Sequence, residues 1–418
     1  MEYTKVARLI MISEENNNKF YDLFDHGDGT MHVEYGRVDS TKLTKTYSSR
    51  EWDSIYRSKT KKGYQDVTSL RTEKVENIKD DKSKDIDDTL GITNINIRSL
   101  FRDLQNYANV VVQENYKVKS TSVTQAMVDE AQKILNDLTS SLKIGADIKK
   151  LNPLLLRLYA VIPRKMQKVQ HHLFKDIVDD ESLKTALAKV SNEQDTLDSM
   201  AAQVLKNTKV QESESKTEKG KKKTTNILDD LGIEIEECAA NEIKIIKDAL
   251  GPDSPKFGKA FKVKNLHTEK KYEEEFEHIT VKKEELFWHG SRNQNWYFIL
   301  QKGLLIRPSG AIHSGSMWGD AVYFADKAKK SIGYSSFRGS YWAAGNSNKA
   351  YLALYRVSVG KQKHYTKWTS DCSRIDQKLL DKEGYHSVFA HGGADLINNE
   401  YTIYNVNQCT IQYLVEII

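Results

Sequence analysis

The stretch Leu286-Phe-Trp-His-Gly-Ser-Arg292 decides the fold of the C-terminal block of this sequence. An apolar run ends there in His289, Gly290 and Ser291. Glycine lets the backbone come close to a flat ligand and offer it an N–H and a C=O, for example to a carboxamide. The flanking histidine and serine can hydrogen-bond a ribose and an amide. The pattern predicts one wall of a ligand pocket, which residues downstream must complete.

Three groups downstream can complete such a pocket. Tyr323-Phe-Ala-Asp326 and Tyr334 set two tyrosines eleven residues apart, a strand-to-helix spacing that could close both faces of an aromatic ring. Ser331 adds a hydroxyl between them, and Asn398-Asn-Glu400-Tyr401 opens a strand with one carboxylate. Each group also has a plainer interpretation, because a tyrosine in an apolar strand is usually core and Glu400 could be a surface charge.

Residue order and spacing exclude several common kinds of site. No Ser-His-Asp order presents itself for a hydrolytic triad, and no metal-ligand spacing recurs, so no metal is expected. The G-x-G-x-x-G and G-x-x-x-x-G-K-[ST] motifs are absent, which excludes Rossmann and P-loop nucleotide sites.

The C-terminal block, residues 226–418, predicts an α+β fold. Apolar and β-branched runs predict strands at 351–359, 401–404 and 410–417. Shorter runs predict helices at 295–301 and 327–332.

Composition sets wider bounds. A chain of 418 residues is expected to form two to four domains, and its net charge of +5 does not by itself indicate a nucleic-acid binder. The three cysteines lie far apart and predict no disulfide framework, which favours an intracellular, reducing compartment. No apolar run is long enough to span a membrane, and the first residues lack a signal-peptide core.

The N-terminal block, residues 1–70, predicts a small, mostly-β domain. Strands are expected at 6–12 and 19–24, then a turn at 26–29 and a third strand through Met31, Val33 and Tyr35. From residue 37 to 62 the chain has eight Lys or Arg against three acids, with aromatic residues interleaved. Phosphates attract such cations, and exposed nucleic-acid ends stack on such rings. A solvated helix face with core aromatics is the alternative.

The middle block, residues 92–205, predicts an all-α domain between two linkers, 71–91 and a disordered 206–225. Apolar residues recur there at helical spacing, and a nearly all-apolar segment, 154–162, is expected to be a buried helix that ends before Pro163. No cluster of chemically useful residues accompanies them, so this block is interpreted as structural or regulatory.

Taken together, His-Gly-Ser-Arg, Tyr-Phe-Ala-Asp, Ser-x-x-Tyr and Asn-Glu-Tyr resemble the catalytic domain of poly(ADP-ribose) polymerases, in order and spacing, over about 190 residues. The resemblance implies NAD+ as a donor substrate, without a metal. It implies that Glu400 is catalytic, contacting the nicotinamide ribose 2′-OH and orienting the acceptor. The NAD+-binding residues it implies are His289, Gly290, Ser291, Asn295, Arg307, Tyr323, Ala325, Ser331 and Tyr334.

Two further resemblances concern the other blocks. Tyr35-Gly36-Arg37 is similar to the Trp-Gly-Arg signature of WGR domains, which implies contact with a DNA end through these three residues. The Leu-Tyr-Ala-Val-Ile-Pro run before residue 164 resembles the helical regulatory domain of the same polymerases. The family therefore implies a DNA-dependent type without zinc fingers, which modifies itself and other proteins and is nuclear if eukaryotic, otherwise cytoplasmic.

Three departures from the family pattern keep alternatives open. Tyr35 replaces Trp, Leu305 stands where Arg is common, with Arg307 two residues on, and Asp320 replaces a Lys. The resemblance implies polymer formation, because His289, Tyr323 and Glu400 match the His-Tyr-Glu set of the family's polymer-forming members. The alternatives are a mono-ADP-ribosyltransferase and a catalytically silent DNA-binding adaptor.

Overall fold

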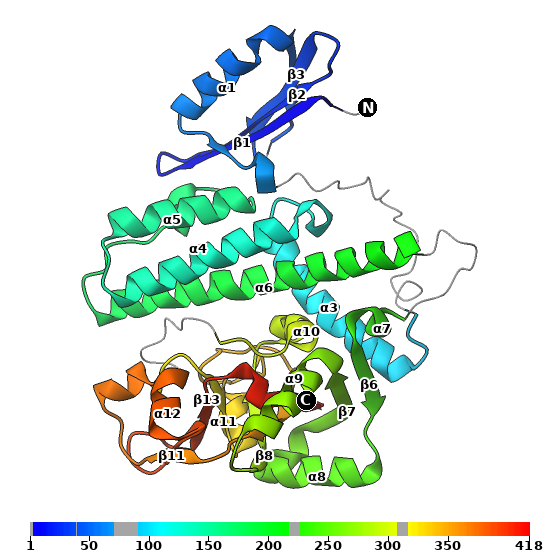
Figure 1. The fold of residues 1–418 in the computed structure, drawn as a ribbon, viewed down its shortest axis with the longest axis vertical. Helices are drawn as coiled ribbons and strands as arrows, with labels where there is room; N and C mark the ends of the chain where they lie inside the picture. Colours follow the sequence, from blue (N-terminus) through cyan, green and yellow to red (C-terminus); the bar gives the residue numbers. More distant parts are fainter. Residues whose placement is uncertain (1–2, 39, 71–90, 217–225, 307–316) are drawn as a thin grey trace. The chain divides into compact units, whose positions relative to one another are not determined.

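The computed structural model describes residues 3–38, 40–70, 91–216, 226–306 and 317–418. The chain divides into two compact units. The first consists of Met1–Asp80 with Val110–Asn207, and the second of Asp81–Asn109 with Thr208–Ile418. Each unit is described by itself below, with the elements labelled as in Figure 1. The predicted segments 71–90 and 217–225 lie outside the described residues.

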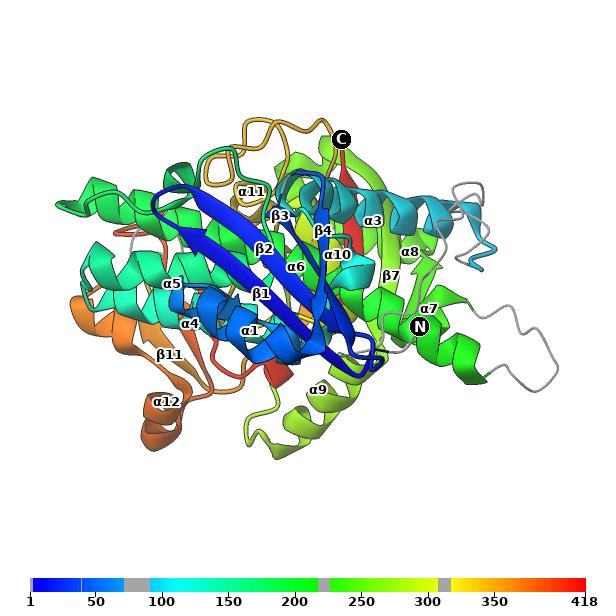
Figure 2. The ribbon, with the colours of Figure 1, turned by 90° about the horizontal axis from the view of Figure 1, so that it is seen from above.

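The first unit opens with an antiparallel sheet in the order β4-β3-β2-β1-β5, in which β4 is an edge strand. Its strands are β1 (Lys5–Ser13), β2 (Asn17–Asp25), β3 (Thr30–Arg37), β4 (Leu43–Ser48) and β5 (Gln65–Asp66). Helix α1 (Trp52–Lys61) lies against one face of this sheet (Figure 2). Trp52 packs there with Leu9, Leu23 and Val33. The three predicted strands are confirmed, because alternating apolar residues give each strand one buried face.

Helices form the rest of this unit. They are the C-terminal part of α3 (Ile95–Asn115), α4 (Gln125–Lys143), α5 (Ile148–Val161) and α6 (Asp180–Lys216) as far as Asn207. Thr124 caps α4 by accepting from the Met127 N–H at 3.2 Å, and Asp147 caps α5 by accepting from the Lys149 N–H at 2.9 Å. The predicted buried helix before Pro163 is confirmed as α5. Within the described residues, no helix is both long and apolar enough to cross a membrane.

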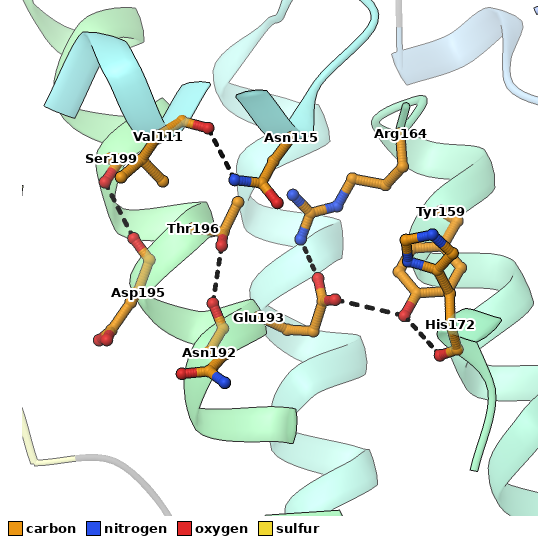
Figure 3. A network of polar contacts seen from close by, with 10 residues as sticks. All are labelled: Val111, Asn115, Tyr159, Arg164, His172, Asn192, Glu193, Asp195, Thr196 and Ser199. Carbon is orange, nitrogen blue, oxygen red and sulfur yellow. Dashed lines mark hydrogen bonds and ion pairs between the residues drawn. The ribbon is translucent and has the colours of Figure 1, made fainter. Parts of the chain in front are cut away.

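A buried polar network joins the segment after α5 to α6 (Figure 3). The Arg164 guanidinium, whose side chain is 5% exposed, pairs with the Glu193 carboxylate and lies 4.2 Å above the Tyr116 ring. The Tyr159 hydroxyl lies 3.3 Å from Glu193 Oε1 and 3.0 Å from the His172 carbonyl. Removing one partner of such a buried pair costs about 3–5 kcal/mol, so this network holds α6 in register.

Helix α6 extends beyond the range predicted for it. A disordered linker was expected from residue 206, but α6 continues to Lys216, so that expectation is wrong for 206–216. Helix nucleation is the costly step, and the packed part of α6 supplies it. Lys, Gln and Glu are good helix formers, and Lys209 pairs with Glu212 one turn on at 3.0 Å. The helix therefore propagates through this polar run.

The second unit is an α+β structure with two sheets, as predicted for the C-terminal block. One sheet has the order β6-β7-β14-β10-β8, with β6 (Ile233–Glu237), β7 (Phe257–Asn265), β8 (Glu284–Gly290), β10 (Ala350–Ser358) and β14 (Cys409–Ile417). The other has the order β11-β12-β13-β9, with β9 (Val322–Phe324), β11 (Gln362–Tyr365), β12 (Ser387–Ala390) and β13 (Glu400–Ile403). Its helices include α7 (Ile227–Leu231), α8 (Ala240–Leu250), α9 (Leu266–His278), α10 (Asn293–Lys302), α11 (Ala328–Ile332) and α12 (Gln377–Glu383).

Backbone hydrogen bonds join the two sheets where β8 ends. The Trp288 N–H donates to the Ala325 carbonyl at 2.8 Å, and the Ala325 N–H donates to the Trp288 carbonyl at 2.9 Å. These two bonds bring the His-Gly-Ser and Tyr-Phe-Ala-Asp motifs together.

The N-terminal turns of α3 belong to the second unit. Lys349 Nζ lies 2.7 Å from the Asp103 carboxylate, and the Phe101 ring lies edge-on to the Tyr297 ring at 5.4 Å. Asn94 Nδ2 donates to Glu237 at 2.8 Å. A helix from far upstream therefore completes this unit.

Candidate active site

A cavity of about 270 Å³ opens beside the junction of the two sheets. Seven residues that the sequence predicted line it together: His289, Gly290, Tyr323, Ala325, Ser331, Tyr334 and Glu400. They come from the end of β8, from β9, α11 and the loop after it, and the start of β13. Ligand pockets are typically about 300–1,000 Å³, so the described cavity suits one end of a dinucleotide better than the whole molecule.

At Gly290 the backbones of β8 and α11 approach each other closely. A Cβ placed on Gly290 would lie 1.9 Å from the Ser331 carbonyl oxygen and 2.7 Å from its carbonyl carbon. Real Cβ atoms do not make such contacts with backbone, so any side chain here would push the strand and the helix apart. The glycine thus permits the close approach that brings Ser331 to the cavity wall.

His289 is partly buried, and its surroundings disfavour a positive charge on the ring. Its Nδ1 lies 3.0 Å from the Tyr323 carbonyl oxygen, which has no proton to give, so Nδ1 carries the hydrogen and Nε2 remains as an acceptor. Burial lowers the pKa of His289 below its ordinary value of 6.5, although the Tyr323 carbonyl opposes this shift. A neutral ring with Nε2 free to accept suits a hydroxyl donor such as a ribose.

Because the pKa of His289 is lowered in the folded protein, we expect the free energy of unfolding to fall as the pH falls. Below about pH 6.5 the unfolded chain takes up a proton on this ring before the folded chain does, so acid favours unfolding. Above that pH the neutral His289 ring contributes fully to the free energy of unfolding. This contribution is lost as the pH falls, by at most about 1.4 kcal/mol per pH unit. Urea unfolding of wild type and His289→Gln at pH 7.5 and 5.5 tests this. The stability difference between them should shrink at pH 5.5, and a constant difference would contradict it.

Glu400 begins β13 and is only 5% exposed. Its Oε1 lies 2.6 Å from Lys330 Nζ, and its Oε2 accepts from the Trp318 indole N–H at 3.0 Å. Burial lowers the pKa of Lys330 and outweighs the opposing attraction of Glu400. Lys330 Nζ also donates to the Asn399 carbonyl at 3.2 Å. The carboxylate therefore lies on the cavity wall with both oxygens engaged.

The two predicted tyrosines lie on the same cavity. The Tyr323 hydroxyl donates to the Gly319 carbonyl at 2.8 Å, and the Tyr334 ring stacks on Trp342 with centroids 6.0 Å apart. Burial raises the pKa of both phenols, so they stay protonated near neutral pH. They offer ring faces and neutral hydroxyls.

Other predicted site residues are not brought to the cavity wall. Ser291 and Asn295 lie beside it and contact each other, since Asn295 Nδ2 donates to Ser291 Oγ at 3.1 Å. Leu305 does line the cavity. Arg307 lies outside the described residues. Asp320 lies close enough to Tyr323 for its charge to raise the pKa of that phenol.

Sequence reasoning missed two residues of this site, Lys330 and Trp318. The only local signal for Lys330 is its place directly before Ser331 in the Ser-x-x-Tyr segment. Trp318 precedes the Tyr-Phe-Ala-Asp motif by five residues, and its contact with Glu400 spans 82 residues.

The predicted DNA-contacting residues lie at the end of β3. The Tyr35 ring packs 5.5 Å from the Tyr21 ring. The Arg37 guanidinium donates to the Asn16 carbonyl at 3.0 Å and to the Gln167 carbonyl at 3.5 Å. A Cβ on Gly36 would meet only ordinary contacts, the nearest at 3.4 Å. DNA contact through these residues stays a prediction.

No group of three or more His, Cys, Asp and Glu side chains that could hold a metal ion occurs in the part of the chain that the structure describes.

Comparison with known proteins finds one matching family model and several proteins of similar sequence. A family model described as the poly(ADP-ribose) polymerase catalytic domain matches residues 243–418. The poly [ADP-ribose] polymerase-like protein 100L of Invertebrate iridescent virus 6 is 32% identical over 186 residues, which are 44% of this chain and 97% of that protein. Protein 101L of the same virus is 34% identical over 201 residues, 48% of this chain and 78% of that protein.

A cellular enzyme matches over a smaller share of its length. Poly [ADP-ribose] polymerase 2 of Homo sapiens is 30% identical over 157 residues, which are 32% of this chain and 26% of that protein. The match therefore spans most of each viral relative but about a quarter of the human one.

Proposed function

The chain belongs to the poly(ADP-ribose) polymerase family and is an NAD+ ADP-ribosyltransferase, and from this premise we propose that it forms poly(ADP-ribose) on itself and on other proteins in response to DNA breaks. One observation carries the proposed site: His289, Tyr323 and Glu400, far apart in sequence, line the same cavity. NAD+ is the substrate of this catalytic domain.

The proposed reaction needs one carboxylate and no acid. The bond from the ribose C1′ to the nicotinamide nitrogen breaks with both electrons leaving on nitrogen, so neutral nicotinamide departs. The ribosyl centre becomes oxocarbenium-like, as in glycoside cleavage. Glu400 stabilises this positive charge, the acceptor oxygen forms the new bond at C1′, and its proton passes to solvent water. Burial strengthens the electrostatic effect, because Glu400 is 5% exposed.

The other side chains bind and orient NAD+ in this proposal. Gly290 and Ser291 hold the carboxamide, and His289 accepts from a ribose hydroxyl on the adenosine side. Tyr334 stacks on the nicotinamide ring and Tyr323 closes the other side, with Ala325 and Ser331 on the same wall. Asn295 and Arg307 are assigned to the adenosine side by resemblance.

Polymer formation is favoured over a single transfer by the position of Glu400. A carboxylate that contacts the nicotinamide ribose can also contact the hydroxyl of an incoming ADP-ribose, which supports elongation. Mono-ADP-ribosylation by the same site is the alternative.

Exposed cations on the first unit support DNA binding. Lys42 flanks the edge strand β4 and Lys45 lies on it, and Arg50, Arg57, Lys61 and Lys62 are exposed on or beside α1. Lys45 Nζ lies 4.6 Å from the centre of the Tyr47 ring, and Lys59 Nζ lies 3.7 Å from that of Tyr21. Cations beside aromatic rings suit a phosphate backbone with exposed bases. In this proposal the helices of the first unit restrain ADP-ribosyl transfer. DNA binding to these cations is the signal that raises the rate of transfer.

One assay tests the proposal in both parts. The full chain is incubated with labelled NAD+, with and without nicked DNA, and both nicotinamide release and the gel pattern are measured. We expect release that rises with nicked DNA and a ladder of products. A single discrete band would favour mono-ADP-ribosylation, and equal release in both arms would contradict DNA dependence.

Charge reversal locates the DNA signal. Lys45→Glu with Arg57→Glu should abolish most of the stimulation by nicked DNA and leave the DNA-free rate unchanged, because several cations act on phosphates together. Lys149→Glu with Lys150→Glu, on the exposed start of α5, changes the net charge equally and is the matched control. Equal loss in both pairs would assign the effect to net charge alone.

A further inference from the structure

We propose that Trp318 is a positioning residue for the catalytic carboxylate: its indole N–H fixes Glu400 Oε2 and so fixes the direction of Oε1 towards the ribosyl centre. This inference rests on the proposed role of Glu400. Nothing in the sequence motifs assigns a function to Trp318.

The geometry at Glu400 is specific. Trp318 Nε1 lies 3.0 Å from Oε2, and Lys330 Nζ lies 2.6 Å from Oε1. In the described part of the chain, the indole is the only donor to Oε2. The Trp318 side chain is buried with 1% exposed, so water does not compete for this bond. Hydrogen bonds to an ionised acceptor are about twice as strong as neutral ones.

Trp318 is itself held at three points. Its backbone N–H donates to the Tyr323 hydroxyl at 3.1 Å, and its backbone carbonyl accepts from the buried Tyr404 hydroxyl. Its ring packs in a core cluster with Leu380 and Val388. The indole therefore cannot swing away, and it ties Glu400 to Tyr323 on the cavity wall.

The two donors to Glu400 differ in kind. Lys330 has a flexible stem and a proton that its lowered pKa makes easier to lose. An indole N–H always carries its hydrogen and has one fixed direction. Trp318 thus keeps the carboxylate oriented even when the Lys330 side chain moves or loses a proton while NAD+ binds and nicotinamide leaves.

Trp318→Phe removes the N–H and keeps most of the ring volume. We expect kcat for nicotinamide release to fall about tenfold, the effect of one charge-assisted hydrogen bond, with KM for NAD+ changed less than about twofold. Trp288→Phe is the matched control, because this equally buried indole donates to the Ala249 carbonyl at 3.2 Å. It should lose comparable stability without the tenfold loss in kcat. Equal kcat for Trp318→Phe and wild type, or equal losses in both variants, would overturn the proposal.

A double mutant separates this inference from the proposed function. In the Glu400→Ala background the indole has no carboxylate to hold, so Trp318→Phe should change the residual rate less than about twofold. A further tenfold loss there would show that Trp318 acts elsewhere. If Glu400→Ala alone keeps full activity, the role of Glu400 fails. If only Trp318→Phe keeps full activity, the role of Glu400 stands and Trp318 is not a positioning residue.

A gentler variant covers the case that Trp318→Phe does not fold. Tyr404→Phe removes one anchor of the Trp318 backbone without changing the indole. It should lower kcat roughly threefold at unchanged KM, as expected for a loosened contact. Unchanged kcat in a folded Tyr404→Phe would overturn the proposal.

Discussion

Glu400→Gln is expected to lower kcat for ADP-ribosyl transfer by about 100- to 1,000-fold, the cost of removing one group that stabilises charge in a transition state. Glutamine keeps the volume of the side chain and can still accept from the Trp318 indole, but it carries no negative charge. NAD+ binding should persist, because the rings and backbone of the cavity do not change. Nicotinamide release and self-modification with labelled NAD+ are the measurements.

The control for Glu400→Gln must separate charge from folding. Glu400→Gln leaves the largely buried Lys330 ammonium without the Glu400 counter-charge, so some loss of stability is expected and should be measured by urea unfolding. Glu383→Gln removes a carboxylate that pairs with Lys363 at the surface and should leave kcat unchanged. Full self-modification by Glu400→Gln would show that another group stabilises the ribosyl centre.

Gly290→Ala is expected to damage both the fold and the activity. The new methyl would lie 1.9 Å from the Ser331 carbonyl oxygen, and backbone atoms on both sides must move to make room. Overpacking of this kind costs about 1–3 kcal/mol or more. A shift of β8 from α11 also misplaces His289 and Ser331, and a displacement near 1 Å can lower kcat about 100-fold.

Gly258→Ala provides the comparison. A Cβ on Gly258 in β7 would come within 2.8 Å of Glu416 Oε1, which is the flexible end of a side chain and can move. We expect a loss of less than about 1 kcal/mol and full activity. Thermal unfolding and steady-state kinetics of the two variants decide the point. Equal behaviour would mean that β8 and α11 tolerate a wider separation than the structure implies.

Local sequence patterns predicted the elements that position the site. The motifs at His289, Tyr323 and Glu400 each carry their own signal, because strand ends and turns have local composition. Backbone pairing of Trp288 with Ala325 then brings them together. The bond from Trp318 to Glu400 could not be predicted in this way, since it depends on side chains that tertiary packing brings together.

The end of α6 and the contacts of Arg37 likewise depend on tertiary packing and not on local sequence. A polar, low-complexity run such as 206–216 has no apolar periodicity, yet a helix already packed elsewhere extends through it. The contact of Arg37 with the Gln167 carbonyl spans 130 residues. Neither outcome depends on nearby residues alone.

Helix α3 has a consequence for how this protein can be divided into fragments. Its first turns supply Phe101 and Asp103 to the second unit, and Asn94 just before it bonds to Glu237 there. A recombinant catalytic fragment that starts at residue 226 would therefore expose the Tyr297 ring edge and leave Lys349 with one fewer counter-charge. The smallest soluble piece should instead begin before residue 94. A chimaera that exchanges the catalytic domain between relatives must therefore also include Asn94 and the first turns of α3.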